Sequence, residues 1–205
     1  MKADGQTTHT KMPGEQRKAQ ILEAATELFA EAGYEGTALR DVAERCGMTK
    51  AALYYHYEDK EAMLRAVVEF RMGRMNDMMD AALSQVPEDQ PLDRIRAFVR
   101  ASARHIDDER PGWVVAARIF WSIETQQDRA AVVALRDRYE GLLRTEIQKA
   151  IDAGLLVDRG VGMMALMILS WLNYIPRWHR LDGPMTSEQV ADTFLDMTLD
   201  GLRAS

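Results

Sequence analysis

Three observations predict an all-α protein. Apolar residues recur at the spacing of one helix face throughout the chain beyond residue 60. No segment there alternates apolar and polar residues over a length that would indicate a strand. Helix starts and ends can be recognised from capping signals, as in the capping box of Thr186 with Gln189 and the helix-ending Gly154. With 205 residues, 47% of them hydrophobic, the chain suits one or two globular domains with a sizeable core.

Residues 37–60 predict two short helices joined by a tight glycine turn. We expect the first helix to begin at Thr37, whose hydroxyl can accept a hydrogen bond from a backbone N–H one turn further on. Gly47 follows where the chain must leave this helix, because glycine adopts a left-handed conformation without a steric penalty. One face of the helix would be buried, namely Leu39, Val42, Ala43 and Cys46.

The second short helix is predicted over residues 50–57, with Thr49 as its N-cap. Leu53 and Tyr57 lie one turn apart and supply the inward face. The outward residues are Lys50, Ala51, Tyr54, Tyr55 and His56. Asp59 can cap the next helix, and Lys60 in its first turn suggests a nearby anion such as a phosphate. Two helices about such a turn form the geometry that places the second helix in a DNA major groove.

The remaining helices follow in order along the chain. A long helix is predicted over 59–85, ended by Pro87 and Pro91. Further helices are expected over 92–108, 111–124, 125–153, 159–181 and 186–203. Pro176 should kink the helix in which it lies. Residues 1–14 are polar and are expected to form a flexible N-terminal arm.

The N-terminal part of the chain resembles the DNA-binding half of the TetR family of bacterial transcriptional regulators. The matching positions are Ala19, Ile21, Leu22, Ala25, Leu28, Phe29, Gly33, Tyr34, Thr37, Arg40, Val42, Ala43, Gly47, Thr49, Lys50, Leu53, Tyr54, His56, Tyr57, Lys60, Glu61 and Leu64. Two positions depart from the family: Tyr57 replaces the usual phenylalanine, and Ala51 stands where glycine is frequent. The resemblance implies a three-helix helix-turn-helix DNA-binding domain over 15–62 and a helical ligand-binding and dimerisation domain over 63–205. It implies a regulator, not an enzyme, with no cofactor.

Bulk charge gives no indication of nucleic-acid binding. The chain carries 26 basic against 32 acidic residues, and residues 1–65 carry nine against eleven. Binding to double-stranded DNA must therefore depend on local arrangement. We expect Arg40, Lys50 and Lys60 to face the duplex. The acidic residues expected to face away are Glu23, Glu27, Glu31 and Glu35.

The family pattern implies which side chains meet DNA. Lys50 and Tyr54 are expected at the bases, with Ala51, Ala52 and the Tyr55 ring against thymine methyl groups. The residues expected at phosphates are Thr37, Arg40, Thr49, His56 and Lys60. For Tyr54 and His56 the alternative is packing against the first of the two helices.

The last two helices predict a homodimer, because their apolar residues cover more than one face. One face can be buried in the subunit and the other in a partner. The expected interface residues are Met164, Ile168, Trp171, Leu172, Ile175, Leu195, Leu199 and Leu202. A monomeric core that uses all of them is the alternative. A two-fold dimer would meet successive major grooves about 34 Å apart, so the operator should be an inverted repeat.

Large aromatic residues mixed with a few polar ones in the central helices predict a cavity for a small hydrophobic effector. The residues expected to line it are Trp113, Arg118, Phe120, Trp121, Met167, Trp171, Asn173, Tyr174, Arg177 and Trp178. The thirteen methionines would let such a cavity adapt to its guest. Ordinary packing of an irregular core explains the aromatic and methionine residues equally well.

Residues 173–186 are similar to the Trp- and Arg-rich junction of a TetR subgroup that regulates lipid, fatty-acid or sterol catabolism and often responds to acyl-CoA thioesters. Arg177 or Arg180 can pair with CoA phosphates, and Trp178 can stack on adenine. Pro176 and Leu181 depart from the subgroup's pattern. A surface cluster that only closes the junction is the alternative. The rival function is a drug-efflux or antibiotic-response repressor that senses amphipathic compounds.

Several classes of function are disfavoured. The single cysteine, Cys46, fits a reducing and therefore cytoplasmic location. The longest apolar run, 161–175, is shorter than the roughly twenty residues that a bilayer requires, so no membrane partner is expected. The four histidines, at 9, 56, 105 and 179, form neither an i, i+4 pair nor a Cys–His pattern, so neither a metal site nor catalysis is expected.

Overall fold

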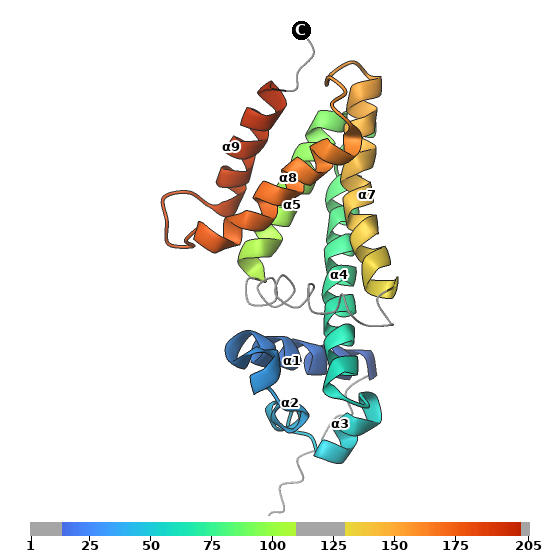
Figure 1. The fold of residues 1–205 in the computed structure, drawn as a ribbon, viewed down its shortest axis with the longest axis vertical. Coiled ribbons are helices and arrows are strands. Elements are labelled where there is room, and N and C mark those ends of the chain that lie inside the picture. Colours follow the sequence, from blue (N-terminus) through green and yellow to red (C-terminus); the bar gives the residue numbers. More distant parts are fainter. Residues whose placement is uncertain (1–13, 110–129, 202–205) are drawn as a thin grey trace, which may run out of the picture. The chain divides into compact units, whose positions relative to one another are not determined.

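The computed structural model describes residues 14–109 and 130–201. In these ranges the chain forms eight helices and no strand, labelled in Figure 1, and the all-α prediction is confirmed. The chain divides into two compact units, and the boundary after Val67 lies within the long helix α4 (Lys60–Ser84). No helix in the described part is both long and apolar enough to cross a membrane.

The first unit contains α1 (Gly14–Gly36), α2 (Leu39–Arg45), α3 (Lys50–His56) and the first turns of α4. Helix α2 packs against both α1 and α3. The predicted buried face of α2 is confirmed, and it joins a core made of Ile21, Leu22, Ala25, Phe29, Leu39, Val42, Ala43, Cys46, Leu53, Met63 and Leu64. Near its end, α1 leaves helical geometry at Gly33 (φ 76°, ψ 169°), a conformation that glycine adopts without strain.

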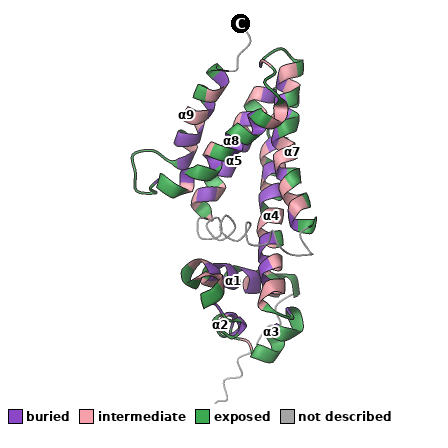
Figure 2. Ribbon diagram, in the orientation of Figure 1, coloured by how far each residue is buried: buried purple, intermediate pink, exposed green. Residues whose placement is uncertain are grey.

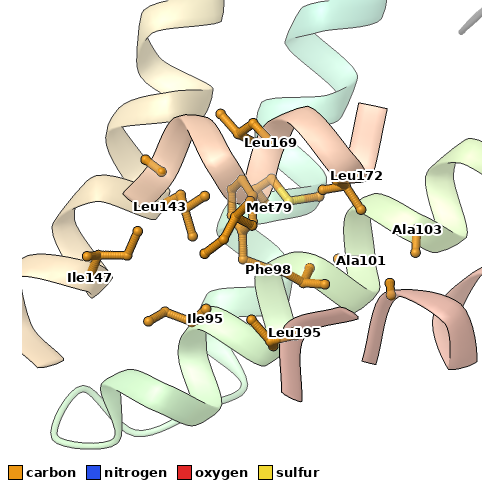
Figure 3. Close-up of a cluster of buried hydrophobic side chains, with 14 of the residues drawn as sticks. Met79, Ile95, Phe98, Ala101, Ala103, Leu143, Ile147, Leu169, Leu172 and Leu195 are labelled. Atoms are coloured by element: carbon orange, nitrogen blue, oxygen red, sulfur yellow. The ribbon is translucent and has the colours of Figure 1, made fainter. Parts of the chain in front are cut away.

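The second unit packs the later turns of α4 with α5 (Pro91–Asp108), α7 (Ala130–Asp152), α8 (Val161–Trp178) and α9 (Ser187–Asp200). Helix α5 contacts α7, α8 and α9. Buried residues follow one side of each helix in Figure 2, as expected for helices that share a core. In Figure 3, Met79, Phe98, Leu143, Leu172 and Leu195 converge from the five helices.

Most helix ends match the capping signals in the sequence. Asp59 accepts a hydrogen bond from the Ala62 N–H at 2.7 Å and so begins α4. The predicted capping box of Thr186 and Gln189 begins α9, with hydrogen bonds of 3.2 and 2.9 Å. Gly154 (φ 69°) follows the end of α7, as predicted. The helix predicted over 111–124, and the start of the one predicted over 125–153, lie outside the described residues.

Helix α8 ends earlier than predicted. It continues through Pro176 but stops at Trp178, because His179 is already extended (φ −68°, ψ 137°). The predicted continuation to residue 181 is therefore wrong. The connection to α9 begins at His179.

A ladder of ion pairs joins α5 to α9. Arg96 and Arg100, one turn apart on α5, both reach Asp192 on α9, at 3.1 and 2.8 Å. One turn later on α5 and one turn earlier on α9, Arg104 lies 3.0 Å from Glu188. Burial alone would raise the pKa of Asp192, but the hydrogen bonds and charges of the two arginines lower it overall. The ladder therefore holds α9 onto α5 through charge as well as apolar contact.

Candidate functional site

The surface of α3 is the first candidate site. Every residue predicted to face outward is exposed, and the Tyr55 side chain is 89% exposed. The Lys50 ammonium lies 5.3 Å from the centroid of the Tyr54 ring, and the Tyr55 and His56 rings meet edge to face at 5.6 Å. One cation and three aromatic or imidazole rings are thus presented together on a seven-residue helix.

The position of α3 is fixed from its inward face and its start. Leu53 is fully buried and Tyr57 nearly so, which confirms the predicted inward face. Burial raises the pKa of the Tyr57 hydroxyl, so this group keeps its proton. The Thr49 hydroxyl accepts from the Ala52 N–H at 3.2 Å and confirms the N-cap, while Gly47 has a left-handed φ of 61° in the turn before it. The Thr49 hydroxyl retains its own hydrogen for donation to a phosphate.

Thr37 does not have the role that its sequence position suggested. The N-cap of α2 is Ala38, and Asp41 accepts the Ala38 N–H at 2.9 Å. The Thr37 side chain is buried, and its hydroxyl lies within hydrogen-bonding distance of the Leu28 and Gly33 carbonyls at 3.1 and 2.8 Å. The prediction of Thr37 as an N-cap is therefore wrong, and its buried hydroxyl is engaged in closing the end of α1 instead of facing a phosphate.

Arg40 is one of the residues that line a shallow hollow of about 430 Å³ beside the start of α2. Its side chain is 73% exposed and lies 3.2 Å from Asp41. The hydrogen bond from Ala38 is the main reason that the pKa of Asp41 is lowered. Four carboxylates line the hollow, from Glu35, Asp41, Glu58 and Asp59. Arg40 and Lys60 are the cations among the lining residues, and the more exposed Arg40 is the more available of the two to an anion.

Lys60 joins the start of α4 to the end of α1. Its ammonium donates to the Tyr34 carbonyl at 2.7 Å and lies 4.2 Å from the Tyr34 ring centroid. Glu35 lies 4.0 Å from this ammonium, and its expected orientation away from the duplex stays a prediction. An ammonium carries three hydrogens, so phosphate contact by Lys60 stays a prediction alongside its structural role.

Arg45 forms ion pairs with two of the acidic residues of α1. It reaches Glu27 at 3.1 Å and Glu31 at 3.2 Å. These pairs balance much of the charge of Arg45 within the unit. Lys50 and Arg40 therefore remain the most exposed cations for which the sequence predicted a DNA contact.

The structure contradicts most of the predicted dimer interface. Six of the eight predicted residues are buried in the core of their own subunit, namely Met164, Ile168, Leu172, Ile175, Leu195 and Leu199. A side chain that is already covered cannot be covered again by a partner, so this part of the prediction is wrong. Trp171 is partly buried and meets the Phe194 ring edge to face at 5.6 Å. Leu202 lies outside the described residues.

The opposite side of α8 leaves large apolar side chains in solvent. We call this surface the outer face of α8 and define it as Met163, Leu166, Met167, Tyr174 and Trp178. Their spacing follows one helical stripe. Met197 on α9 is also exposed, as are Leu181 and Met185 in the connection between the two helices. Exposed apolar surface of this kind usually marks a site of association.

The predicted effector site divides into parts with different outcomes. Trp113, Arg118, Phe120 and Trp121 lie outside the described residues. Met167, Asn173, Tyr174, Arg177 and Trp178 are exposed on α8 and Trp171 is partly buried, so the lining of an effector cavity by these residues stays a prediction. The Arg177 guanidinium lies 5.6 Å from the centroid of the Tyr174 ring, where it forms a cationic and aromatic surface.

The sequence analysis missed the polar groups inside the second unit. Asn76 on α4 is fully buried and donates to carbonyls of Met72 (2.9 Å) and Leu135 (3.0 Å), while its Oδ1 has no hydrogen-bond partner within the described ranges. The hydroxyl groups of Ser102 and Tyr139 lie 2.9 Å apart in the same core. Burial raises the pKa of Tyr139, which therefore stays protonated. Periodicity gives no signal for such residues, since a polar residue on a helix is normally assigned to the surface.

Comparisons with known proteins bear on both units. A family model of bacterial regulatory proteins, tetR family, matches residues 21–67. A model of the tetracyclin repressor-like C-terminal domain matches residues 88–202. Together they cover most of the first unit and most of the second.

Individual relatives match over nearly their whole length. The HTH-type transcriptional repressor KstR2 of Mycobacterium tuberculosis (strain ATCC 25618 / H37Rv) is 27% identical over 198 residues, which is 91% of this chain and 92% of KstR2. The TetR family transcriptional regulator PfmR from Thermus thermophilus has a TM-score of 0.77 at 35% identity, covering 90% of this chain and 99% of that one. AibR, solved in complex with isovaleryl coenzyme A and operator DNA, has a TM-score of 0.75 at 29% identity, covering 88% and 97%.

Proposed function

Because the chain belongs to the TetR family of bacterial DNA-binding transcriptional regulators, we propose that it is an effector-responsive repressor that binds an inverted-repeat operator as a homodimer. The observation that carries the proposal is the exposed surface of α3, held in place by Leu53, Tyr57 and the Thr49 cap. Repression is favoured by KstR2, which is named a repressor and matches over most of both chains. Such a regulator acts where the chromosome lies, in the cytoplasm.

The DNA-reading role rests on the chemistry of the α3 surface. The Lys50 ammonium can donate to guanine acceptors in the major groove, and the exposed Tyr55 ring can touch a thymine methyl group. Arg40 and the Thr49 hydroxyl supply donors for phosphates at the two sides of this contact. Ala51 and Ala52 are small and exposed, so they let the helix backbone approach the bases.

The outer face of α8 supports a dimer. Its members cover one continuous helical stripe, and the buried side of the same helix is already used by the core. A two-fold axis would bring the same stripe of each subunit together, with Met197 of α9 at its side. Two recognition helices set about 34 Å apart would then meet successive grooves of an inverted repeat.

We infer that the effector is a hydrophobic acyl-CoA thioester. AibR was solved with isovaleryl coenzyme A and operator DNA, so a relative of this fold binds an acyl-CoA. In this chain Arg177 is exposed and can form an ion pair with a phosphate of a CoA head group. The buried Asn76 Oδ1 offers an acceptor inside the second unit. Coupling of roughly 1–3 kcal/mol between effector and DNA would change operator occupancy about five- to 150-fold.

Two measurements test this function. A palindromic site is first selected from random duplexes, and the purified protein must prefer it over a scrambled duplex of the same composition. The protein is then titrated with isovaleryl coenzyme A, longer acyl-CoA thioesters and cationic amphipathic drugs, and thermal shift and operator release are measured. These measurements distinguish an acyl-CoA sensor from a drug-responsive repressor. Failure to select any palindrome overturns the operator proposal, and a response to the drugs alone overturns the acyl-CoA assignment.

A further inference from the structure

An unpaired hydrogen-bond acceptor lies in the core of the second unit. Asn76 on α4 is fully buried, and its amide nitrogen donates to the carbonyl of Met72 at 2.9 Å and to that of Leu135 on α7 at 3.0 Å. A carbonyl only accepts hydrogen bonds, so these two contacts determine which end of the amide carries the nitrogen. The amide oxygen, Oδ1, is shielded from solvent and has no hydrogen-bond partner among residues 14–109 and 130–201.

The neighbouring hydroxyl groups do not supply a hydrogen to this oxygen. Tyr139 lies one turn after Leu135 on α7, and its hydroxyl is 2.9 Å from that of Ser102 on α5. The Ser102 hydroxyl also lies 3.4 Å from the sulfur of Met79, one turn after Asn76 on α4. A thioether sulfur has no hydrogen to give, so Ser102 donates to Met79 and Tyr139 donates to Ser102. Both hydroxyl hydrogens are thereby used, and the polar layer formed by Asn76, Ser102 and Tyr139 keeps a surplus of acceptors.

An unpaired acceptor in a core opposes folding, by about five- to 150-fold in the folding constant. A ligand that donates a hydrogen to Oδ1 recovers this free energy, so the oxygen selects among ligands by whether they carry a donor. The surrounding side chains can make room for such a ligand. Met72 is partly buried and Met75 and Met79 are buried on the same helix, and unbranched methionine side chains readily adopt new arrangements.

The donor that suits this site is a neutral hydroxyl group. The carbonyl of a saturated acyl thioester only accepts hydrogen bonds, so it cannot pair with Oδ1. An amide N–H brings its own carbonyl, for which the polar layer has no donor left. An ammonium group buried beside neutral acceptors would lack a counter-charge. A hydroxyl group supplies one hydrogen in a small volume and leaves the rest of the ligand apolar.

We propose that Asn76 Oδ1 is the binding site for a hydroxyl group on the apolar part of the effector. Combined with the proposed acyl-CoA function, on which it rests, this makes the effector a hydroxyacyl thioester and not a saturated one. Asn76 also joins α4 to α7 through the Leu135 carbonyl. A purely structural role for Asn76 predicts a loss of stability on substitution but no selection among ligands, so ligand selectivity is the decisive measurement.

Matched ligands that differ in a hydroxyl group test the inference. Dissociation constants are measured by isothermal titration calorimetry for octanoyl-CoA, β-hydroxyoctanoyl-CoA and ω-hydroxyoctanoyl-CoA. At least one hydroxylated thioester should bind about five- to 150-fold more tightly than octanoyl-CoA. Decanol and its isomer methyl nonyl ether form a second pair without coenzyme A, in which only the alcohol has a hydrogen to donate. Equal affinities within every pair overturn the inference, as does the absence of binding by every compound.

Variants assign the selectivity to one atom. Asn76→Leu removes the acceptor and should bind the members of each pair equally. Tyr139→Phe is the matched control, because it removes a buried hydrogen bond from the same core but leaves Oδ1 in place, so the preference should persist. A preference that persists in Asn76→Leu, or that disappears in Tyr139→Phe, overturns the assignment to Asn76. If Asn76→Leu folds too poorly for titration, Asn76→Ser keeps a donor for the Met72 carbonyl, lacks the amide oxygen and should show the same loss of preference.

The experiment distinguishes failure of this inference from failure of the proposed effector class. If the thioesters bind regardless of their hydroxyl groups, the acyl-CoA assignment stands and the hydroxyl site is overturned. If no thioester binds, but decanol binds more tightly than the ether and this preference depends on Asn76, the acyl-CoA assignment fails and the hydroxyl site stands.

Discussion

Leu166→Ala tests which side of α8 joins two subunits. Leu166 is 53% exposed on the outer face of α8, whereas Ile168, two residues further on, is buried in the core. Complete burial of a leucine side chain is worth about 1.5–3 kcal/mol, so covering the exposed half of Leu166 is worth about 1 kcal/mol. An isologous dimer covers two copies, and the substitution should cost about 2 kcal/mol, or about 30-fold in the dimer dissociation constant.

Sedimentation equilibrium over a range of concentrations measures this constant, with the chain mass of 23.2 kDa identifying the monomer. Leu155→Ala is the matched control, because Leu155 is similarly exposed (42%) but follows α7. Ile168→Ala should instead lower the free energy of unfolding by about 2–5 kcal/mol through a core cavity. A dissociation constant unchanged in Leu166→Ala, or weakened equally by Leu155→Ala, would refute the assignment of the outer face.

Three further substitutions probe other parts of the molecule. Lys50→Ala should weaken specific binding by roughly 1–3 kcal/mol in a fluorescence-anisotropy titration against the selected operator. Arg45→Ala is the control, because Arg45 is paired with acidic residues of α1. Equal losses of operator affinity in the two variants would contradict the assignment of Lys50 to the DNA contact. Tyr139→Phe should lower the free energy of unfolding by about 1 kcal/mol in urea, since it removes the buried hydroxyl that meets Ser102, and an unchanged value would argue against that hydrogen bond. Asp192 has a lowered pKa in the folded state, so it stabilises the fold above its unfolded pKa of about 3.9 and loses this effect as pH falls. Asp192→Asn should therefore be less stable than the wild type near neutral pH and should lose less stability on acidification. If the free energies of unfolding of the two proteins change in parallel between neutral and acidic pH, the ladder does not contribute to stability.

The sequence predicted features that depend on a few neighbouring residues. The turn at Gly47, the caps at Thr49 and Asp59 and the capping box that begins α9 are each set by local backbone geometry. The inward face of α3 could likewise be assigned, because Leu53 and Tyr57 have the spacing of a buried stripe and both are buried. The fold class and the candidate DNA surface were therefore accessible from sequence.

Features that depend on distant segments were not accessible. Thr37 has the chemistry of an N-cap, but it bonds to carbonyls of α1 whose position depends on the break at Gly33. On α8 both sides are apolar, so a period of 3.6 residues cannot tell the core side from the outer side. The hydrogen bond from Ser187 to Asp107 joins residues 80 positions apart in the chain, and no local pattern indicates such a contact.

The two sides of α8 differ in the kind of apolar residue they carry, and this difference fits the proposed switch. The core side consists mainly of branched residues such as Ile168, Leu172 and Ile175, which favour one well-defined packing, and it includes one methionine, Met164. The outer face includes Met163 and Met167, whose unbranched side chains fit more than one neighbouring surface. A repressor released by an effector must change the spacing of its recognition helices while its subunits stay associated. An interface rich in methionine tolerates such a change at little cost, whereas the branched core next to it keeps each subunit rigid enough to transmit the change.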